Sequence, residues 1–152
     1  MNIFVLDRDP EIAASYMINK HVVKMVLESA QLLCTTVAMC NDVQTPYKVT
    51  HKNHPCSIWA KASLSNFNWL CEHALAICEQ YTRRYGKVHK SQAVIEWCID
   101  NPPSIADIGL TEFAQVMPDE YRCADVVEAY RNYYCGEKVQ MLGKSEVFLL
   151  GV

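Results

Sequence analysis

Several common protein classes are excluded by features that this chain lacks. Eight cysteines occur among its 152 residues, but no two are spaced C-x-x-C, which argues against a zinc ribbon or a thioredoxin-like site. No apolar run approaches the roughly 20 residues of a membrane-spanning helix. Residues 1–6 are followed at once by Asp7 and Arg8, so the apolar start is too short for a signal peptide. We therefore expect a cytoplasmic protein with reduced cysteines in its core.

Catalytic motifs and an excess of positive charge are missing as well. The chain contains no nucleophile elbow, no Walker loop and no zinc-protease motif. Its net charge is −3 and its pI is about 5.9, whereas proteins that coat duplex DNA usually present a basic surface. These absences favour binding over turnover, and a compact pocket for a small anion over an extended contact with duplex DNA.

A strong helical pattern is what the sequence does contain. The chain is 51% hydrophobic and 20% charged, which is typical of a globular domain. Apolar spacing, proline positions and capping residues predict helices over residues 10–40 with a break near 19, from 55 through 59, over 64–85, 89–100 and 124–142. We expect an all-α single domain over residues 1–152. A minor pairing of two short strands, 3–6 and 146–150, is a further expectation.

Residues 81–90 hold the densest run of chemical groups, with two tyrosines, four cations and a histidine. Gly86 is predicted to end the preceding helix in a left-handed conformation. Cations in the last turn of a helix favour its dipole and need no further role. They could also form half of an anion pocket, together with the N–H groups at the start of the next helix.

A polar stripe and a histidine loop offer two further candidate sites. His21, Lys24 and Glu28 recur at helical spacing and either line a pocket or form a solvated face with an i,i+4 ion pair. His51 and His54 lie three residues apart beside a helix start. A metal site needs three or four converging ligands, so we expect neither a metal nor another cofactor.

These groups could converge on one small nucleotide that carries phosphate. The aromatic side chains would stack on its base, and residues 104–121 could close over it as a loop. The candidate phosphate contacts are Lys20, Lys24, Arg84, Lys87 and Lys90. The candidate base or ribose contacts are His21, His54, Trp59, Asn66 and Tyr85, with His51 in the same pocket-lining loop.

The combined motifs resemble a family of small uncharacterised proteins of tailed bacteriophages. The resemblance covers residues 1 to about 138 and implies no established activity. The motifs that carry it are residues 19–25, 50–55 with Trp59, 85–90, 117–121 and 129–131.

The order of elements also resembles that of the phage pyrimidine dimer DNA glycosylases. In both, a short N-terminal segment leads into a helix, a histidine precedes a long helix, and a tyrosine-rich basic stretch, here 130–134, lies near the end. That family acts through an N-terminal threonine amine and a glutamate on its first helix. This chain instead has Asn2, which is expected to leave Met1 in place, and Val22 and Val23 with Glu28 further on. The resemblance therefore implies the fold and no catalytic residue.

Sequestration of a nucleotide signal is the leading functional hypothesis from the sequence. By analogy with phage proteins that counter host defence, the chain would bind a cyclic nucleotide or an ADP-ribose derivative without cleaving it. It would then not be an enzyme, and a homo-oligomer would surround the ligand. The alternatives are a DNA glycosylase or endonuclease, a hydrolase of a nucleotide signal that uses His21, Glu28 or His51, and a protein inhibitor that uses residues 104–121.

Overall fold

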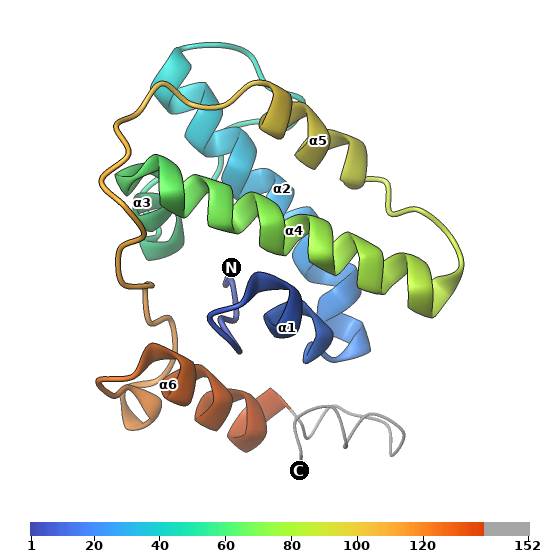
Figure 1. Cartoon of the computed structure of the whole chain (residues 1–152), viewed down its shortest axis with the longest axis vertical. Coiled ribbons are helices and arrows are strands. Elements are labelled where there is room, and N and C mark those ends of the chain that lie inside the picture. Colours follow the sequence, from blue (N-terminus) through green and yellow to red (C-terminus); the bar gives the residue numbers. More distant parts are fainter. Residues whose placement is uncertain (139–152) are drawn as a thin grey trace.

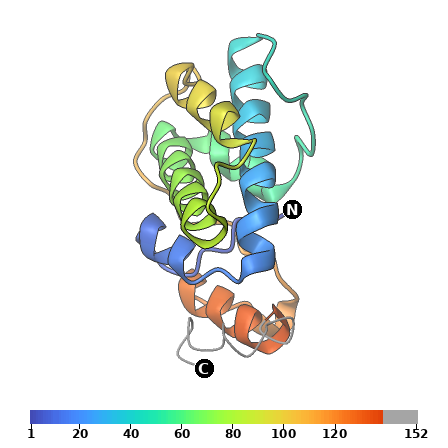
Figure 2. The same ribbon diagram turned by 90° about the vertical axis from the view of Figure 1, so that its right-hand side faces the viewer.

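Two long antiparallel helices, α2 (Asn19–Asn41) and α4 (Leu64–Tyr85), form the centre of the fold (Figures 1 and 2). The computed structural model describes residues 1–138, and the all-α prediction is confirmed. The other elements are α1 (Pro10–Ser15), α3 (Pro55–Ala62), α5 (Gln92–Asp100), a 3₁₀ turn (Asp119–Tyr121), α6 (Val126–Tyr133) and a π-helical turn (Tyr134–Lys138).

Residues 3–6 do not form the expected strand. Phe4 has a φ of +55°, and the Leu6 N–H donates a hydrogen bond to the Phe4 carbonyl only two residues back, at 2.9 Å. This local turn is incompatible with a regular strand ladder. Residues 146–150, the expected partner, lie outside the described residues. Residues 3–6 instead lie among the helices as an irregular segment, with their apolar side chains buried.

Helix α2 combines the length of a membrane span with the burial of a core helix. By length and composition it could cross a bilayer, but 67% of its most apolar window is buried inside the structure. It packs against α3, α4 and α5. Burial against three helices is what an apolar helix at the centre of a folded domain requires.

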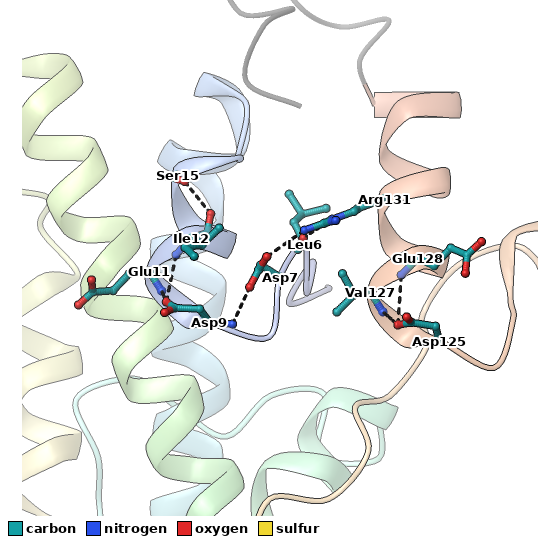
Figure 3. Close-up of polar contacts among 10 residues, drawn as sticks. All are labelled: Leu6, Asp7, Asp9, Glu11, Ile12, Ser15, Asp125, Val127, Glu128 and Arg131. Atoms are coloured by element: carbon teal, nitrogen blue, oxygen red, sulfur yellow. Dashed lines mark hydrogen bonds and ion pairs between the residues drawn. The ribbon is translucent and has the colours of Figure 1, made fainter. Parts of the chain in front are cut away.

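Side-chain caps fix where the short helices begin. Asp9 accepts the Ile12 N–H at 3.2 Å at the start of α1, and Asp125 accepts the Val127 N–H at 3.0 Å at the start of α6 (Figure 3). Gly86 ends α4 with a φ of +69°, as predicted. The predicted break near residue 19 is also present, because α1 stops at Ser15 and α2 starts at Asn19.

A long irregular segment, residues 101–118, runs from α5 back past α3 and α4 to α6 (Figure 1). The fully buried Asn66 side chain anchors it, because Nδ2 donates to the Trp59 carbonyl at 2.9 Å and to Thr111 Oγ1 at 2.7 Å. Asn66 Oδ1 in turn accepts the Thr111 N–H at 2.9 Å. One amide thus joins α3, α4 and this segment.

Asn66→Ala should destabilise the fold by about 2–4 kcal/mol, because it leaves a buried carbonyl and a partly buried N–H without partners. Urea unfolding followed by tryptophan fluorescence measures the effect. Asn68→Ala is the matched control, since Asn68 is exposed on the same helix. The control should stay within about 0.5 kcal/mol of the unmodified protein. Equal stabilities of the two variants would contradict the anchoring role.

Candidate functional site

A pocket of about 410 Å³ opens where the N-terminal segment meets α2 and the C-terminal part of the described chain. Segments that are far apart in the sequence come together there, so the pocket exists only in the folded chain. Its lining residues are Met1, Asn2, Phe4, His21, Lys24, Met25, Glu28, Val116, Met117, Tyr133 and Lys138.

The α-amine of Met1 and the carboxylate of Glu28 form an ion pair in this pocket. Met1 N lies 3.4 Å from Glu28 Oε1. The second oxygen, Oε2, is buried and has no hydrogen-bond partner among the described residues, although Lys24 Nζ lies 4.0 Å away. A buried acceptor without a partner costs about 1–3 kcal/mol. The pocket therefore keeps an amine and an unsatisfied carboxylate oxygen side by side.

Asn2 holds the end of the chain in position beside this pair. Its Oδ1 accepts the N–H groups of Ile3 and Phe4 at 2.8 and 3.1 Å. Its Nδ2 donates to the Val116 carbonyl at 2.7 Å. Asn2 is itself buried, so its three hydrogen bonds leave the amine of Met1 little freedom to move.

Helices α6 and α4 hold the following residues of the N-terminal segment. From α6, Arg131 donates to the Leu6 carbonyl at 2.7 Å and to Asp7 Oδ2 at 2.9 Å (Figure 3). From α4, Trp69 Nε1 donates to the Arg8 carbonyl at 2.9 Å. The fully buried His73 ring also faces the Ile3 carbonyl, with 3.3 Å between Nε2 and the oxygen.

His21 supports the pocket wall and is held in its neutral form. Its ring stacks on Phe4 with 4.5 Å between ring centroids, and its Nδ1 lies 2.9 Å from the Tyr134 hydroxyl. Burial first, and then the charges of Lys138, Lys24 and Lys20, lower its pKa to about 4. Of these lysines, Lys24 and Lys138 line the pocket and give it positive charge.

The start of α3 lies close to the amine. His54 caps this helix, because its Nδ1 accepts the Cys56 N–H at 3.1 Å. Burial and then the charge of the N-terminal ammonium lower the pKa of His54. Burial also raises the pKa of the Cys56 thiol to about 12, so this cysteine is protonated at neutral pH. Of the predicted ligand residues, His21 and Lys24 thus line the pocket, and His54 lies near enough to the amine for its charge to lower the pKa of the histidine.

Trp59, Asn66 and Arg84 instead hold the fold together. Trp59 is buried and stacks on Phe113 with 5.0 Å between ring centroids, and Asn66 anchors residues 101–118. Arg84 donates to the Met17 carbonyl at 2.7 Å and to Asn19 Oδ1 at 2.9 Å. It therefore joins the end of α4 to the connection between α1 and α2.

The remaining predicted ligand residues lie on the surface, outside the pocket lining. Residues 81–90 contribute nothing to that lining. The one pocket that the sequence predicted, shared by these residues, His21, Lys24 and the loop at 51–54, is therefore not formed. These exposed residues are Lys20, His51, Tyr85, Lys87 and Lys90.

The sequence interpretation missed the amine of Met1, and with it Asn2, Tyr133 and Lys138. The sequence did contain one indication of this site. Glu28 lies seven residues after His21 on the same helix face and is the one acidic residue of that stripe. The position of the amine depends on long-range contacts that no local pattern contains. Among residues 1–138 there is also no group of three His, Cys, Asp or Glu side chains that could hold a metal ion.

Comparison with known proteins gives one match. A family model described as pyrimidine dimer DNA glycosylase matches residues 1–93, which is more than half of the chain of 152 residues. The matched part runs from the N-terminal segment through α2 with Glu28, α3 and α4 to the first residues of α5. No curated protein and no solved structure matches the chain.

The neutral state of His21 predicts a loss of stability in acid. Its pKa is about 4 in the folded protein and about 6.5 in an unfolded chain. Between these values only the unfolded state binds the proton. The stabilisation is therefore complete above pH 6.5 and decreases, by on the order of 2–3 kcal/mol, as the pH falls to 4.

Chemical unfolding at a series of pH values measures this dependence. His21→Gln should flatten the curve between pH 6.5 and 4. A residual slope should remain, because burial also lowers the pKa of His73. A variant whose slope equals that of the unmodified protein would show that His21 is not held neutral.

Proposed function

Because the chain belongs to the pyrimidine dimer DNA glycosylase family, we propose that it removes damaged pyrimidine bases from duplex DNA. The observation that carries this proposal is the ion pair between the Met1 amine and Glu28, 3.4 Å apart in a pocket. An amine beside a carboxylate is a suitable pair for covalent attack on a sugar carbon. The reduced state of the buried cysteines would suit the cytoplasm.

The family overturns the hypothesis that the chain sequesters a nucleotide signal. The small nucleotide ligand, the counter-defence role and the low rank of duplex DNA as a partner were wrong. Duplex DNA was considered an unlikely partner because the net charge is −3. Net charge, however, says nothing about where on the surface the charges lie. The homo-oligomer expected around that ligand loses its basis with it. The glycosylase alternative takes the place of this hypothesis.

The proposed reaction begins with the unprotonated amine of Met1 attacking C1′ of the damaged nucleotide. A bond forms between the amine nitrogen and C1′ while the bond from C1′ to the base breaks. The bonding electrons leave with the base, which takes up a proton released by the amine nitrogen, so that the nitrogen regains a lone pair. This lone pair then opens the sugar ring and a cationic imine joins residue 1 to C1′. The ring oxygen takes up the proton that Glu28 accepted from the ammonium and becomes a hydroxyl. Water releases the sugar by hydrolysis of this imine.

Glu28 has two roles in this scheme. Its Oε1 is close enough to the amine to receive a proton from it and so to free the nucleophile. Once it has passed this proton to the ring oxygen, its negative charge lies beside the cationic imine and stabilises it, and this effect is strongest in a site shielded from water. Because Glu28 is only 9% exposed, the carboxylate is well shielded.

The remaining pocket residues suit a nucleotide drawn out of the duplex. Glycosylases reach their target by extruding a nucleotide from the base stack. The volume of about 410 Å³ lies within the range of small-molecule sites. Tyr133 contributes an aromatic ring to the lining, with the Lys138 ammonium 5.2 Å from the ring centroid. A flanking phosphate that binds Lys138 and Lys24 would draw this ammonium from the ring and free the ring to stack on a base.

Glu28→Gln should slow base removal by about 10²–10⁴-fold without weakening DNA binding. The substrate is ultraviolet-irradiated duplex DNA. Alkali cleaves the strand at each abasic site that base removal leaves, so the strand breaks measure the reaction. Borohydride reduction of the protein bound to a duplex with an abasic site should trap a covalent complex. Glu96→Gln makes the same chemical change on the exposed face of α5 and should behave as the unmodified protein does.

Two outcomes would contradict this account. If the unmodified protein neither releases bases nor becomes trapped, the glycosylase proposal fails. If Glu28→Gln is folded by circular dichroism and reacts at the unmodified rate, the role of Glu28 fails while the activity stands.

A further inference from the structure

We propose that the exposed face of α2 and residues 86–91, between α4 and α5, form one phosphate-binding surface that extends the DNA contact beyond the pocket. This inference rests on the proposed function for the identity of the partner. We call residues 86–91 the α4–α5 corner. It adds a second contact region to a site that would otherwise hold the DNA only at the damaged nucleotide.

A hydrogen bond holds the α4–α5 corner against α2. His89 Nδ1 accepts the Ser91 N–H at 3.0 Å, so in the neutral ring Nε2 carries the proton. This Nε2 donates to the Val23 carbonyl on α2, also at 3.0 Å. The Tyr81 ring packs against His89 with 4.8 Å between centroids. Figure 2 shows the corner running alongside α2.

The joined surface carries positive charge and no carboxylate. On α2, Lys20, Val23, Lys24 and Leu27 are exposed, whereas Glu28 is turned inward to the amine. The α4–α5 corner reads Gly-Lys-Val-His-Lys-Ser and adds two exposed lysines. Among the described residues, no hydrogen bond or ion pair occupies the ammonium groups of the three lysines away from the pocket. These three are Lys20, Lys87 and Lys90.

Continuity with the pocket makes a DNA strand the fitting partner. Lys24 belongs to both regions, because it lines the pocket and lies one turn from Lys20 on α2. A backbone that leaves the pocket over Lys24 therefore meets Lys20 and then the corner lysines. Val23, Leu27 and Val88, which are 42%, 40% and 65% exposed, lie among these cations and could contact the sugars.

The acidic residues of this region of the fold gather on another face. A separate hollow of about 420 Å³ between α1 and α4 is lined with carboxylates. In Figure 2, α1 and α2 lie on opposite sides of the C-terminal half of α4. A chain of net charge −3 can thus present one basic face to DNA. The carboxylates of the hollow are Asp9, Glu11, Glu72 and Glu79.

Replacing both corner lysines, as Lys87→Ala with Lys90→Ala, tests this surface. The probe is a fluorescent duplex with a stable abasic-site analogue, and its dissociation constant is measured over a series of salt concentrations. Each lost phosphate contact should reduce the salt slope by about 0.9. We expect a slope reduced by about 1.5–2 and binding weakened by about 10-fold or more at ~0.1 M salt.

Three comparisons keep the result interpretable. Lys48→Ala with Lys61→Ala removes the same charge elsewhere and should leave the slope unchanged. Lys87→Arg with Lys90→Arg should bind as the unmodified protein does, because the charge remains. With saturating natural abasic-site duplex, the rate of borohydride trapping should be the same for the corner variant and the unmodified protein, since the corner does not touch the reacting atoms.

The outcomes separate this inference from the proposed activity. An unmodified salt slope in the corner variant, or weak binding by the arginine variant, would overturn the surface even if trapping succeeds. A reduced slope without any trapping in the unmodified protein would support the surface and refute the glycosylase chemistry.

Discussion

The buried N-terminal segment is the constraint on which the site depends. Residues 3–6 are enclosed by helices, and the ion pair with Glu28 fixes the direction of the amine at their end. Val116, His73 and Arg131 hold the segment from residues 101–118, α4 and α6 respectively. A flexible terminus would lose conformational entropy each time it met a substrate. Here folding has already ordered the terminus, so substrate binding does not have to order the Met1 amine at a further cost in conformational entropy.

Much of the fold follows from local sequence. Asp9 followed by Pro10 predicts the start of α1, and Gly86 predicts the end of α4, because caps depend on only a few neighbouring residues. The start of α5 was misplaced, at 89 in place of Gln92. His89 is instead bound to the Val23 carbonyl, 66 residues away in sequence. Contacts of that range also turned the expected strand at residues 3–6 into a threaded segment.

The site was only partly predictable, because it also depends on contacts between residues that are far apart in the sequence. The shared face of His21, Lys24 and Glu28 follows from helical period, and all three line the pocket. Trp59 and Asn66 have side chains suited to a ligand, yet the fold uses them to bind residues 101–118. The amine of Met1 carries no residue-type signal at all. Net charge misdirected the choice of partner, because the sum over the chain does not show that exposed lysines lie along α2 and residues 86–91 while carboxylates line the hollow between α1 and α4.

The attachment point of the trapped DNA tests the central claim most directly. After borohydride reduction with an abasic-site duplex, the complex can be digested with nuclease and protease and its peptides analysed by mass spectrometry. The account predicts that the sugar remnant is attached to the α-amine of Met1 in the N-terminal peptide. Attachment to the side chain of Lys24 or Lys138, with the α-amine unmodified, would contradict it.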